Sequence, residues 1–281
     1  MDNTSSGAGT CANASRLEKS ELNGAPVTVD DLRVLTLVNY GHFTSMQVSD
    51  GAVRGLDLHM QRIEDATQRL FGSSLDIAAV RAHMRHILDG EHGQFSLRLN
   101  VFSRQLQRER MDEPASPEVL ITLGPARTAH VTPLRVKAFR HQRTLAEVKH
   151  VGTFELFHHR RLAQQQGYDD ALFMDATGAV SEGSIWNIGF FDGQGIVWPD
   201  APQLRGVSMQ LLQQGLRERG IVTTTRRIEL AQVGAFRSAF FTNSGCPVRA
   251  IACIDATAFK VDAELVDLLE SCYASNPLQT I

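Results

Sequence analysis

Lys149 stands where an amine could become reactive. It lies in the stretch "LAEVKHVGTFELF", after a strand-like run and directly before residues with helical spacing. A lysine that is held between two rigid elements and partly removed from water has a lowered pKa, so its amine is free to form a Schiff base with an aldehyde. A solvated surface lysine is the alternative, since most lysines in proteins are exposed.

A carboxylate, Glu182, follows in "AVSEGSIWNIGF", where a turn and short strands would carry it toward the interior of a sheet. A buried carboxylate needs a cationic or hydrogen-bonding partner. The protonated nitrogen of an aromatic ring would be such a partner, and its charge would help the ring to accept electrons from a substrate carbanion. A carboxylate in a surface turn is the alternative.

Three stretches offer donors for a phosphate group. "LRGVSMQ" places the amides of Val207 and Ser208 at a predicted helix start, where unpaired N–H groups and the helix dipole favour an anion. "FFTNSGCPV" adds Ser244 and Gly245 in a loop after a strand, and Arg62, on a predicted helix, could add charge-assisted bonds. An ordinary polar turn and a helix-surface arginine are the corresponding alternatives.

The composition excludes several classes of function. The chain has 281 residues, of which 43% are hydrophobic and 21% charged, and its formal net charge of -3 leaves no basic surface suited to nucleic acid. Its four cysteines show neither CxxC pairs nor metal-ligand spacing, so we expect no metal site and a reducing, cytoplasmic location. No apolar run reaches the ~18 residues of a membrane span, so we expect no membrane partner.

The elements that must position these residues are strands and helices in two successive blocks. Short strands with turns are predicted from "ELNGAPVTV" onward, and Asp50-Gly51 predicts a hairpin. Apolar spacing predicts helices at residues 56–70 and 77–87, and alternation predicts strands at "QFSLRLNVFSR" and "EVLITL". The second block has a strand at "LRVKAF", helices at residues 155–166 and "GVSMQLLQQGLRERG", later strands and a last helix near "DAELVDLLESC". This order indicates an α+β protein.

The same pattern predicts two domains. Residues 1–20, rich in Ser, Gly, Ala and Asn, are expected to form a disordered tail, and residues 21–124 a smaller N-terminal α+β domain. The Gly-, Pro- and polar-rich stretch "GPARTAHVT" predicts an interdomain linker at residues 125–133. Residues 134–281 then form a larger C-terminal domain.

Taken in order, these motifs resemble those of the class IV aminotransferases, the fold-type IV pyridoxal-phosphate enzymes that include D-amino-acid and branched-chain aminotransferases and aminodeoxychorismate lyase. "GHFTSMQVSDGAVRGLDLHMQRI" resembles the family's glycine-aromatic segment and His-x-x-Arg helix, "VKH" its Schiff-base lysine, and "DATGAVSEGSIWNIGFF" its G-x-V-x-E-x-x-x-x-N stretch. "LRGVSM" and "FFTNSGCPV" resemble its phosphate-binding segments. The resemblance covers roughly residues 39–251 and implies a two-domain fold with the cofactor in the interdomain cleft.

The resemblance also implies a role for each matched residue. Lys149 would form an aldimine with pyridoxal 5'-phosphate and carry the proton between the substrate α-carbon and the cofactor, while Glu182 would bind the pyridine nitrogen. The residues that would hold the phosphate are Arg62, Val207, Ser208, Ser244 and Gly245. The C-terminal domain would be the cofactor-binding one, and the protein would be a homodimer.

The chain departs from the family pattern near the expected substrate. Many members have a tyrosine five residues after the lysine, where this chain has Phe154, and the arginine that often follows the G-[IV]-T motif is Met209 here. An arginine fork would suit an α-carboxylate. The candidates for substrate binding are Phe43, Arg104, Arg108 and Arg110, of which the arginines lie in "FSRQLQRER". A solvated charged loop is the alternative for that segment.

The function implied by the resemblance is transamination, in which an amino acid or amine leaves its nitrogen on the cofactor and a 2-oxo acid then collects it. The β-elimination of an aminodeoxychorismate lyase is an alternative, favoured by His150 directly after the lysine. A non-catalytic binding protein with the same fold is a second alternative.

Overall fold

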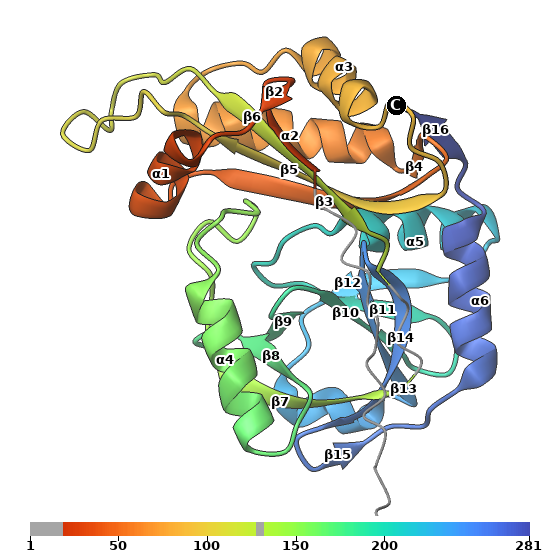
Figure 1. Cartoon of the computed structure of the whole chain (residues 1–281). Coiled ribbons are helices and arrows are strands. Elements are labelled where there is room, and N and C mark those ends of the chain that lie inside the picture. The colour runs from red at the N-terminus through yellow and green to blue at the C-terminus, as the bar shows by residue number, and fades with distance from the viewer. Residues whose placement is uncertain (1–18, 128–131) are drawn as a thin grey trace, which may run out of the picture.

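The computed structural model describes residues 19–127 and 132–281, in which two β-sheets lie one above the other in the view of Figure 1. The first sheet is antiparallel and has seven strands in the order β16-β4-β3-β5-β6-β1-β2. Its strands are β1 (Lys19–Leu22), β2 (Ala25–Pro26), β3 (His42–Ser49), β4 (Ala52–Arg54), β5 (Gln94–Phe102), β6 (Glu118–Pro125) and β16 (Leu278–Thr280).

The turn between β3 and β4 confirms the predicted hairpin. Asp50 and Gly51 adopt positive φ angles of 47° and 73°. Two successive positive φ angles are what a type I′ turn requires, and Asp-Gly is one of the sequences that favour it. β3 also pairs with β5 along its whole length, and this ladder forms the centre of the first sheet.

Helices α2 (Leu56–Phe71) and α3 (Ile77–Ile87) cover one face of the first sheet (Figure 1). α2 buries Leu56, Met60 and Ile63, as their helical spacing predicts. These side chains join a core cluster with the inward residues of β3, β5 and β6. Truncating one such side chain to alanine costs ~2–5 kcal/mol.

A further helix, α1 (Val29–Val38), occupies a segment where short strands and turns are predicted. Thr28 and Asp31 form a capping box, in which the Asp31 amide donates to Thr28 Oγ1 at 3.3 Å and the Thr28 amide donates to Asp31 Oδ2 at 2.8 Å. The Thr-x-x-Asp spacing is the sequence signal for this helix start. β-branched residues in "VDDLRVLTLV" favour a strand instead.

The second sheet has nine strands and closes on itself. The order is β12-β11-β10-β13-β14-β7-β8-β9, with β15 beside β14, and β9 pairs with β10 as well as with β8. The strands are β7 (Leu134–Arg140), β8 (Asp170–Met174), β9 (Val180–Gly183), β10 (Asn187–Phe191), β11 (Ile196–Pro199), β12 (Thr223–Arg226), β13 (Ser238–Asn243), β14 (Cys246–Ile254) and β15 (Thr257–Ala258).

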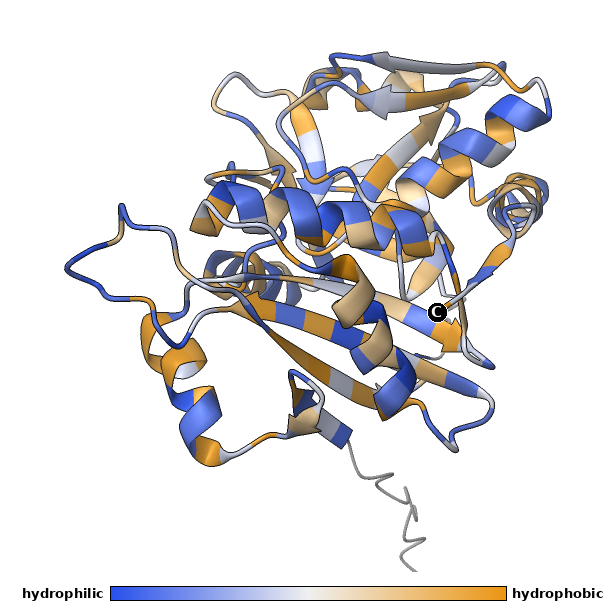
Figure 2. Cartoon of the chain, turned by 90° about the horizontal axis from the view of Figure 1, so that it is seen from above, coloured by the Kyte–Doolittle hydropathy of each residue, from blue (hydrophilic) through white to orange (hydrophobic). Residues whose placement is uncertain are grey.

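The helices of this half are α4 (Phe154–Gln165), α5 (Val207–Glu218), α6 (Ala263–Ala274) and the short 3-10 helix η1 (Leu230–Ala235). α4 begins one residue before its predicted start and packs against β8, and α5 begins directly after Gly206, as predicted. Hydrophilic and hydrophobic residues alternate along the helices (Figure 2), whereas β8, β9, β10 and β11 are buried along nearly their whole length. Apolar residues of this half form separate clusters inside the closed sheet and under α5 and α6.

The observed elements cross the predicted domain limits at two places. β16 comes from residues 278–280 yet pairs with β4 of the first sheet, and β6 continues to Pro125, inside the predicted linker. Residues 1–18 of the predicted tail and 128–131 of the predicted linker lie outside the described residues, whereas Lys19 and Ser20 belong to β1. Among the helices that the structure describes, none is both long and apolar enough to cross a membrane.

Candidate active site

A pocket of about 1060 Å³, counted with its open mouth, lies between the two sheets. The lining residues that come from the first sheet and its helix α2 are Phe43, Ser45, Gln47, Arg62 and Arg98. Predicted site residues that also line it are Lys149, Glu182, Val207, Ser244 and Gly245. Ser208 is buried beside them in the first turn of α5. The fold therefore brings together residues that are widely separated in the sequence.

The backbone around Lys149 is paired with the start of β3. The Phe43 amide donates to the Lys149 carbonyl at 2.8 Å, and the Val151 amide donates to the Gly41 carbonyl at 2.9 Å. The Lys149 amine lies 4.7 Å from the centre of the Phe43 ring. The first sheet thus fixes the position of a lysine that belongs to the second half of the chain.

Desolvation lowers the pKa of Lys149 to about 7, and the positive charges of Arg62 and Arg143 act in the same direction. The charge of Glu182 acts in the opposite direction and does not offset them. An amine with a pKa of about 7 is roughly half unprotonated at neutral pH, and the unprotonated form is the one that a nucleophile or a general base requires.

Glu182 lies on β9 with its side chain only 8% exposed and pairs with Arg143, whose side chain is 7% exposed. Arg143 Nε donates to Glu182 Oε1 at 2.9 Å, and the Leu204 amide donates to Glu182 Oε2 at 3.2 Å. Burial raises the pKa of Glu182, and Arg143 opposes that rise. The buried carboxylate therefore has the cationic and hydrogen-bonding partners that its burial demands.

Arg62 lies beside the start of α5. Its Nη2 donates to the Arg205 carbonyl at 2.7 Å, and burial lowers its pKa to about 10, so the guanidinium remains charged at neutral pH. Gly206 precedes α5, and a Cβ atom there would lie 2.1 Å from Asn187 Oδ1. The missing side chain lets Asn187 approach the helix start, where unpaired N–H groups favour an anion.

The loop between β13 and β14 also lines the pocket. Asn243 Oδ1 accepts hydrogen bonds of 2.9 Å from the amides of Gly245 and Cys246. This turn leaves Ser244 at its tip, lining the pocket. The Gly245 amide is already bonded within the turn, so Ser244 is the better donor to a ligand.

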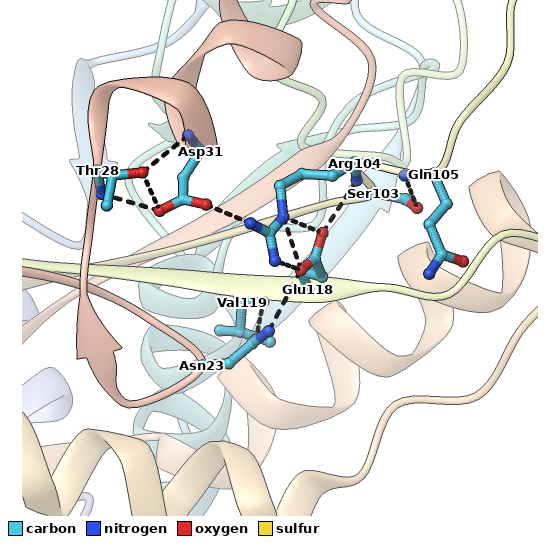
Figure 3. Close-up of polar contacts among 8 residues, drawn as sticks. All are labelled: Asn23, Thr28, Asp31, Ser103, Arg104, Gln105, Glu118 and Val119. Atoms are coloured by element: carbon cyan, nitrogen blue, oxygen red, sulfur yellow. Dashed lines mark hydrogen bonds and ion pairs between the residues drawn. The ribbon is translucent and has the colours of Figure 1, made fainter.

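The structure does not bring Arg104, Arg108 and Arg110 to the pocket. Arg104 lies between Asp31 and Glu118, with a distance of 2.6 Å from its Nη2 to Glu118 Oε1 (Figure 3). Arg108 donates to the carbonyl of a residue near the end of α1, and Arg110 pairs with a nearby glutamate. These guanidiniums stabilise the loop and its neighbours.

Arginines outside the predicted set of site residues also line the pocket. Arg98 lies with its guanidinium carbon 3.6 Å from the centre of the Phe43 ring and donates from Nε to Asn100 Oδ1 at 2.8 Å. Arg127 and Arg143 also line the pocket. The alternating strand "FSLRLN" places Arg98 on its polar side. Alternation alone does not show that this side faces the pocket and not bulk water.

Phe154, which stands where many members of the family have a tyrosine, lies outside the pocket. It is 75% exposed at the start of α4, and its ring stacks on His158 with 5.6 Å between ring centres. The neighbours Thr153, Leu156 and Phe157 line the pocket instead.

Comparison with known proteins agrees with this geometry. The profile of the family described as Amino-transferase class IV matches residues 41–254. A probable branched-chain-amino-acid aminotransferase of Rickettsia felis is 29% identical over 118 residues. That alignment covers 41% of this chain and 41% of the relative, so it spans well under half of either protein.

Solved structures share the fold over nearly the whole chain. The branched-chain aminotransferase of Thermoproteus uzoniensis, solved with norvaline, has a TM-score of 0.82 at 18% identity and covers 93% of this chain and 98% of its own. A hypothetical aminotransferase of Mycobacterium tuberculosis, in a PLP-bound form, has a TM-score of 0.76 at 18% identity, with coverages of 93% and 100%. A putative 4-amino-4-deoxychorismate lyase of Legionella pneumophila has a TM-score of 0.74 at 17% identity, with coverages of 86% and 93%.

At these identities the structural likeness establishes the fold, which is that of the fold-type IV enzymes. The family profile extends over most of the chain and includes β3, Lys149, Glu182, the start of α5 and the loop after β13. The chain belongs to the class IV aminotransferase family.

Proposed function

We propose that this chain is a pyridoxal 5'-phosphate-dependent aminotransferase that moves an amino group between an amino acid or amine and a 2-oxo acid. One observation carries the proposal. A desolvated lysine amine and a buried carboxylate share a pocket that a guanidinium and a helix start also line. Members of this family use pyridoxal 5'-phosphate, and that cofactor has three groups that match these three features.

The residues present fit the cofactor. Arg62, the amides of Val207 and Ser208, and Ser244 would hold the phosphate, because a guanidinium and an amide-rich helix start suit a dianion. Among the described residues, no side chain caps the start of α5, so its first N–H groups remain open to a ligand. Glu182 would bind the protonated ring nitrogen, and Lys149 would take the aldehyde.

When bound, the cofactor supplies a cationic aromatic ring that takes up electrons from the substrate α-carbon. Lys149 Nζ, whose pKa is lowered to about 7, would accept the proton from that carbon and deliver it to the cofactor. Glu182 holds the proton on the ring nitrogen, and the phosphate donors keep the ligand in place when its bond to the lysine is broken. The apolar walls at Phe43, Leu156 and Trp186 exclude water from the reacting atoms.

A spectroscopic titration tests this proposal. Adding pyridoxal 5'-phosphate to the cofactor-free protein is expected to produce an absorption band near the violet edge, and borohydride followed by peptide mapping is expected to locate the cofactor on Lys149. The Lys149→Ala variant should give no such band. The control is Lys260→Ala, which removes a surface lysine that pairs with Asp262 and should leave the band intact. A colourless wild type would support the non-catalytic alternative instead.

Elimination from a chorismate-derived substrate is a second candidate, and one observation favours it. His150 lines the pocket directly beside the lysine, and desolvation lowers the pKa of its ring, so it is neutral and able to accept a proton. An assay for pyruvate separates the two reactions. An eliminating enzyme releases pyruvate continuously without an amino acceptor, whereas an aminotransferase stops after one half-reaction.

The proposal includes a homodimer that works in the cytoplasm. Large apolar side chains are exposed on α1, where Val29 is 82% and Leu37 64% exposed, and at the start of α4, where Phe154 is 75% exposed. Both helices lie at the left edge of Figure 1. Exposed apolar surface of this kind favours burial against another chain. Light scattering of the purified protein is expected to give twice the chain mass of 31.0 kDa.

A further inference from the structure

Arg143 uses all three nitrogens of its guanidinium within the protein. Nε donates to Glu182 Oε1 at 2.9 Å and Nη1 to the Val148 carbonyl at 2.9 Å, while Nη2 donates to the Ala146 carbonyl. Its side chain is only 7% exposed. A buried guanidinium with every nitrogen bonded has a single well-defined position, because moving it would leave a buried charge or carbonyl without a partner.

Two of these bonds fix the loop that leads into Lys149. Leu145 adopts a positive φ of 51°, which is costly for a leucine and is held by a turn in which the Val148 amide donates to the Leu145 carbonyl at 2.9 Å. The carbonyls of Ala146 and Val148 in this turn then point at Arg143. Since Val148 directly precedes Lys149, the guanidinium sets where the lysine backbone begins.

The third bond fixes the carboxylate. A nearby cation lowers the pKa of a buried carboxylate, and the remaining partner of Glu182 is the Leu204 amide at 3.2 Å. Arg143 thus supplies the positive charge that opposes the rise in the pKa of Glu182 caused by burial. One side chain therefore connects the two groups that would hold opposite ends of the ligand ring.

We propose that Arg143 is a positioning residue that fixes Lys149 and Glu182 relative to one another and pairs with the buried carboxylate. The inference rests on the proposed function for its purpose, but the contacts that carry it belong to the protein alone. Arg143 is also one of the charges that hold the pKa of Lys149 low, after desolvation and Arg62.

The charged and titratable groups around the Lys149 amine come from several elements. They are Arg62 and His59 of α2, Arg98 of β5, Glu182 of β9, and Arg143 and His150 of the loop itself. Arg143 differs from the other cations because it also bonds Glu182, so its removal affects both groups at once.

The test measures the Lys149 amine in the cofactor-free protein, so it does not depend on a loaded enzyme. Each variant is labelled with acetic anhydride from below to above the wild-type pKa of about 7, and the Lys149 peptide is quantified by mass spectrometry. Arg143→Gln is expected to raise the apparent pKa by about one unit, which leaves roughly tenfold less neutral amine below the pKa. Arg143→Lys, which keeps the positive charge, is expected to bring the apparent pKa of Lys149 back most of the way to the wild-type value.

The matched control is Arg160→Gln, which breaks another partly buried arginine pair, with Asp170 at 2.8 Å, and Arg160 is not among the charges that shift the pKa of Lys149. It is expected to lower thermal stability without moving the Lys149 pKa. If Arg143→Gln lowers stability in the same way and leaves the labelling profile unchanged, Arg143 is structural and the inference is wrong.

If Arg143→Gln does not fold, Arg143→Gln combined with Glu182→Gln avoids a lone buried charge. This pair is expected to raise the apparent pKa by a smaller amount, because the effect of Arg143 on Lys149 exceeds that of Glu182. An unchanged profile in the pair contradicts the inference. Failure of the wild type to bind pyridoxal 5'-phosphate would contradict the proposed function while leaving these labelling results interpretable.

Discussion

The backbone amide of Phe43 donates a 2.8 Å hydrogen bond to the backbone carbonyl of Lys149. Phe43 belongs to the first sheet and Lys149 to the loop before α4, so pairing between distant parts of the chain places the lysine. The bridge between His42 and His150 continues the pairing. The distance between the lysine and the pocket wall is therefore set by strand pairing and not by loop flexibility.

Replacing the pocket lysine should make the cofactor-free protein more stable near neutral pH. The folded pKa of Lys149, about 7, lies below its ordinary value of 10.5, so between these values the unfolded chain binds more protons and stability rises with pH, by at most about 1.4 kcal/mol per pH unit. Lys149→Met removes this dependence. Its stabilising effect in urea unfolding is expected to be largest at pH 7 and below, and to disappear toward pH 10. A gain independent of pH would contradict the lowered pKa.

Removal of the buried carboxylate should destabilise the protein more than its neutralisation. Glu182→Ala leaves Arg143 as a lone buried charge, and breaking a buried pair in this way costs about 3–5 kcal/mol. Glu182→Gln keeps an oxygen for the Arg143 Nε bond of 2.9 Å, so its cost is expected to be smaller. Thermal and urea unfolding of the two variants provide the comparison, and equal losses would show that the hydrogen bond kept by glutamine does not offset the loss of the charge.

An alanine at Gly206 should disturb both the fold and phosphate binding. The new Cβ would lie 2.1 Å from Asn187 Oδ1, and Asn187 would have to give up its bonds of 2.7 Å to the Leu204 carbonyl and 3.0 Å to Gln203. We expect a loss of about 1–3 kcal/mol in urea unfolding and weaker binding of pyridoxal 5'-phosphate. Gly234→Ala is the control, since its Cβ would have an ordinary contact of 3.6 Å.

Arg98 and Arg104 are alternative candidates for binding a substrate carboxylate, and one variant of each distinguishes them. Arg98 lines the pocket, so Arg98→Gln is expected to raise KM for an amino acid roughly tenfold, equivalent to about 1.4 kcal/mol of lost binding. Arg104 is held between Asp31 and Glu118, so Arg104→Gln should change KM little. A reversed result from steady-state kinetics would restore the sequence-based candidate and would imply that the loop rearranges on binding.

Much of the fold follows from local patterns in the sequence. The Asp50-Gly51 hairpin, α2, α3 and the start of α5 were predicted because each depends on residues close together in the chain. α1 was missed because its capping box is a weaker signal than the strand preference of its valines. The pairing of β16 with β4 was missed because a three-residue strand has no pattern of its own.

The pocket could be predicted where spacing along the chain carries the information. Short motifs predict Lys149 and Glu182 as site residues, and both line the pocket. No short motif indicates Arg98 or Arg143, because their importance depends on contacts with Phe43 and Glu182, which are distant in sequence. The alternation of apolar and polar residues along β5 correctly predicts which side chains face the core. It cannot show that the polar side faces a pocket, since that depends on the position of the second sheet.

The pairing of β16 with β4 has a consequence for biosynthesis. A nascent chain emerges from the ribosome starting at its N-terminus, so β3, β4 and β5 are available long before residues 278–280. The edge of β4 therefore stays unpaired until β16 has been synthesised. Only then can Ile281, which is 5% exposed in the folded protein, pack into the core beside α2 and α3. Completion of the first sheet therefore follows synthesis of the entire second sheet, although most strands of the first are made earlier.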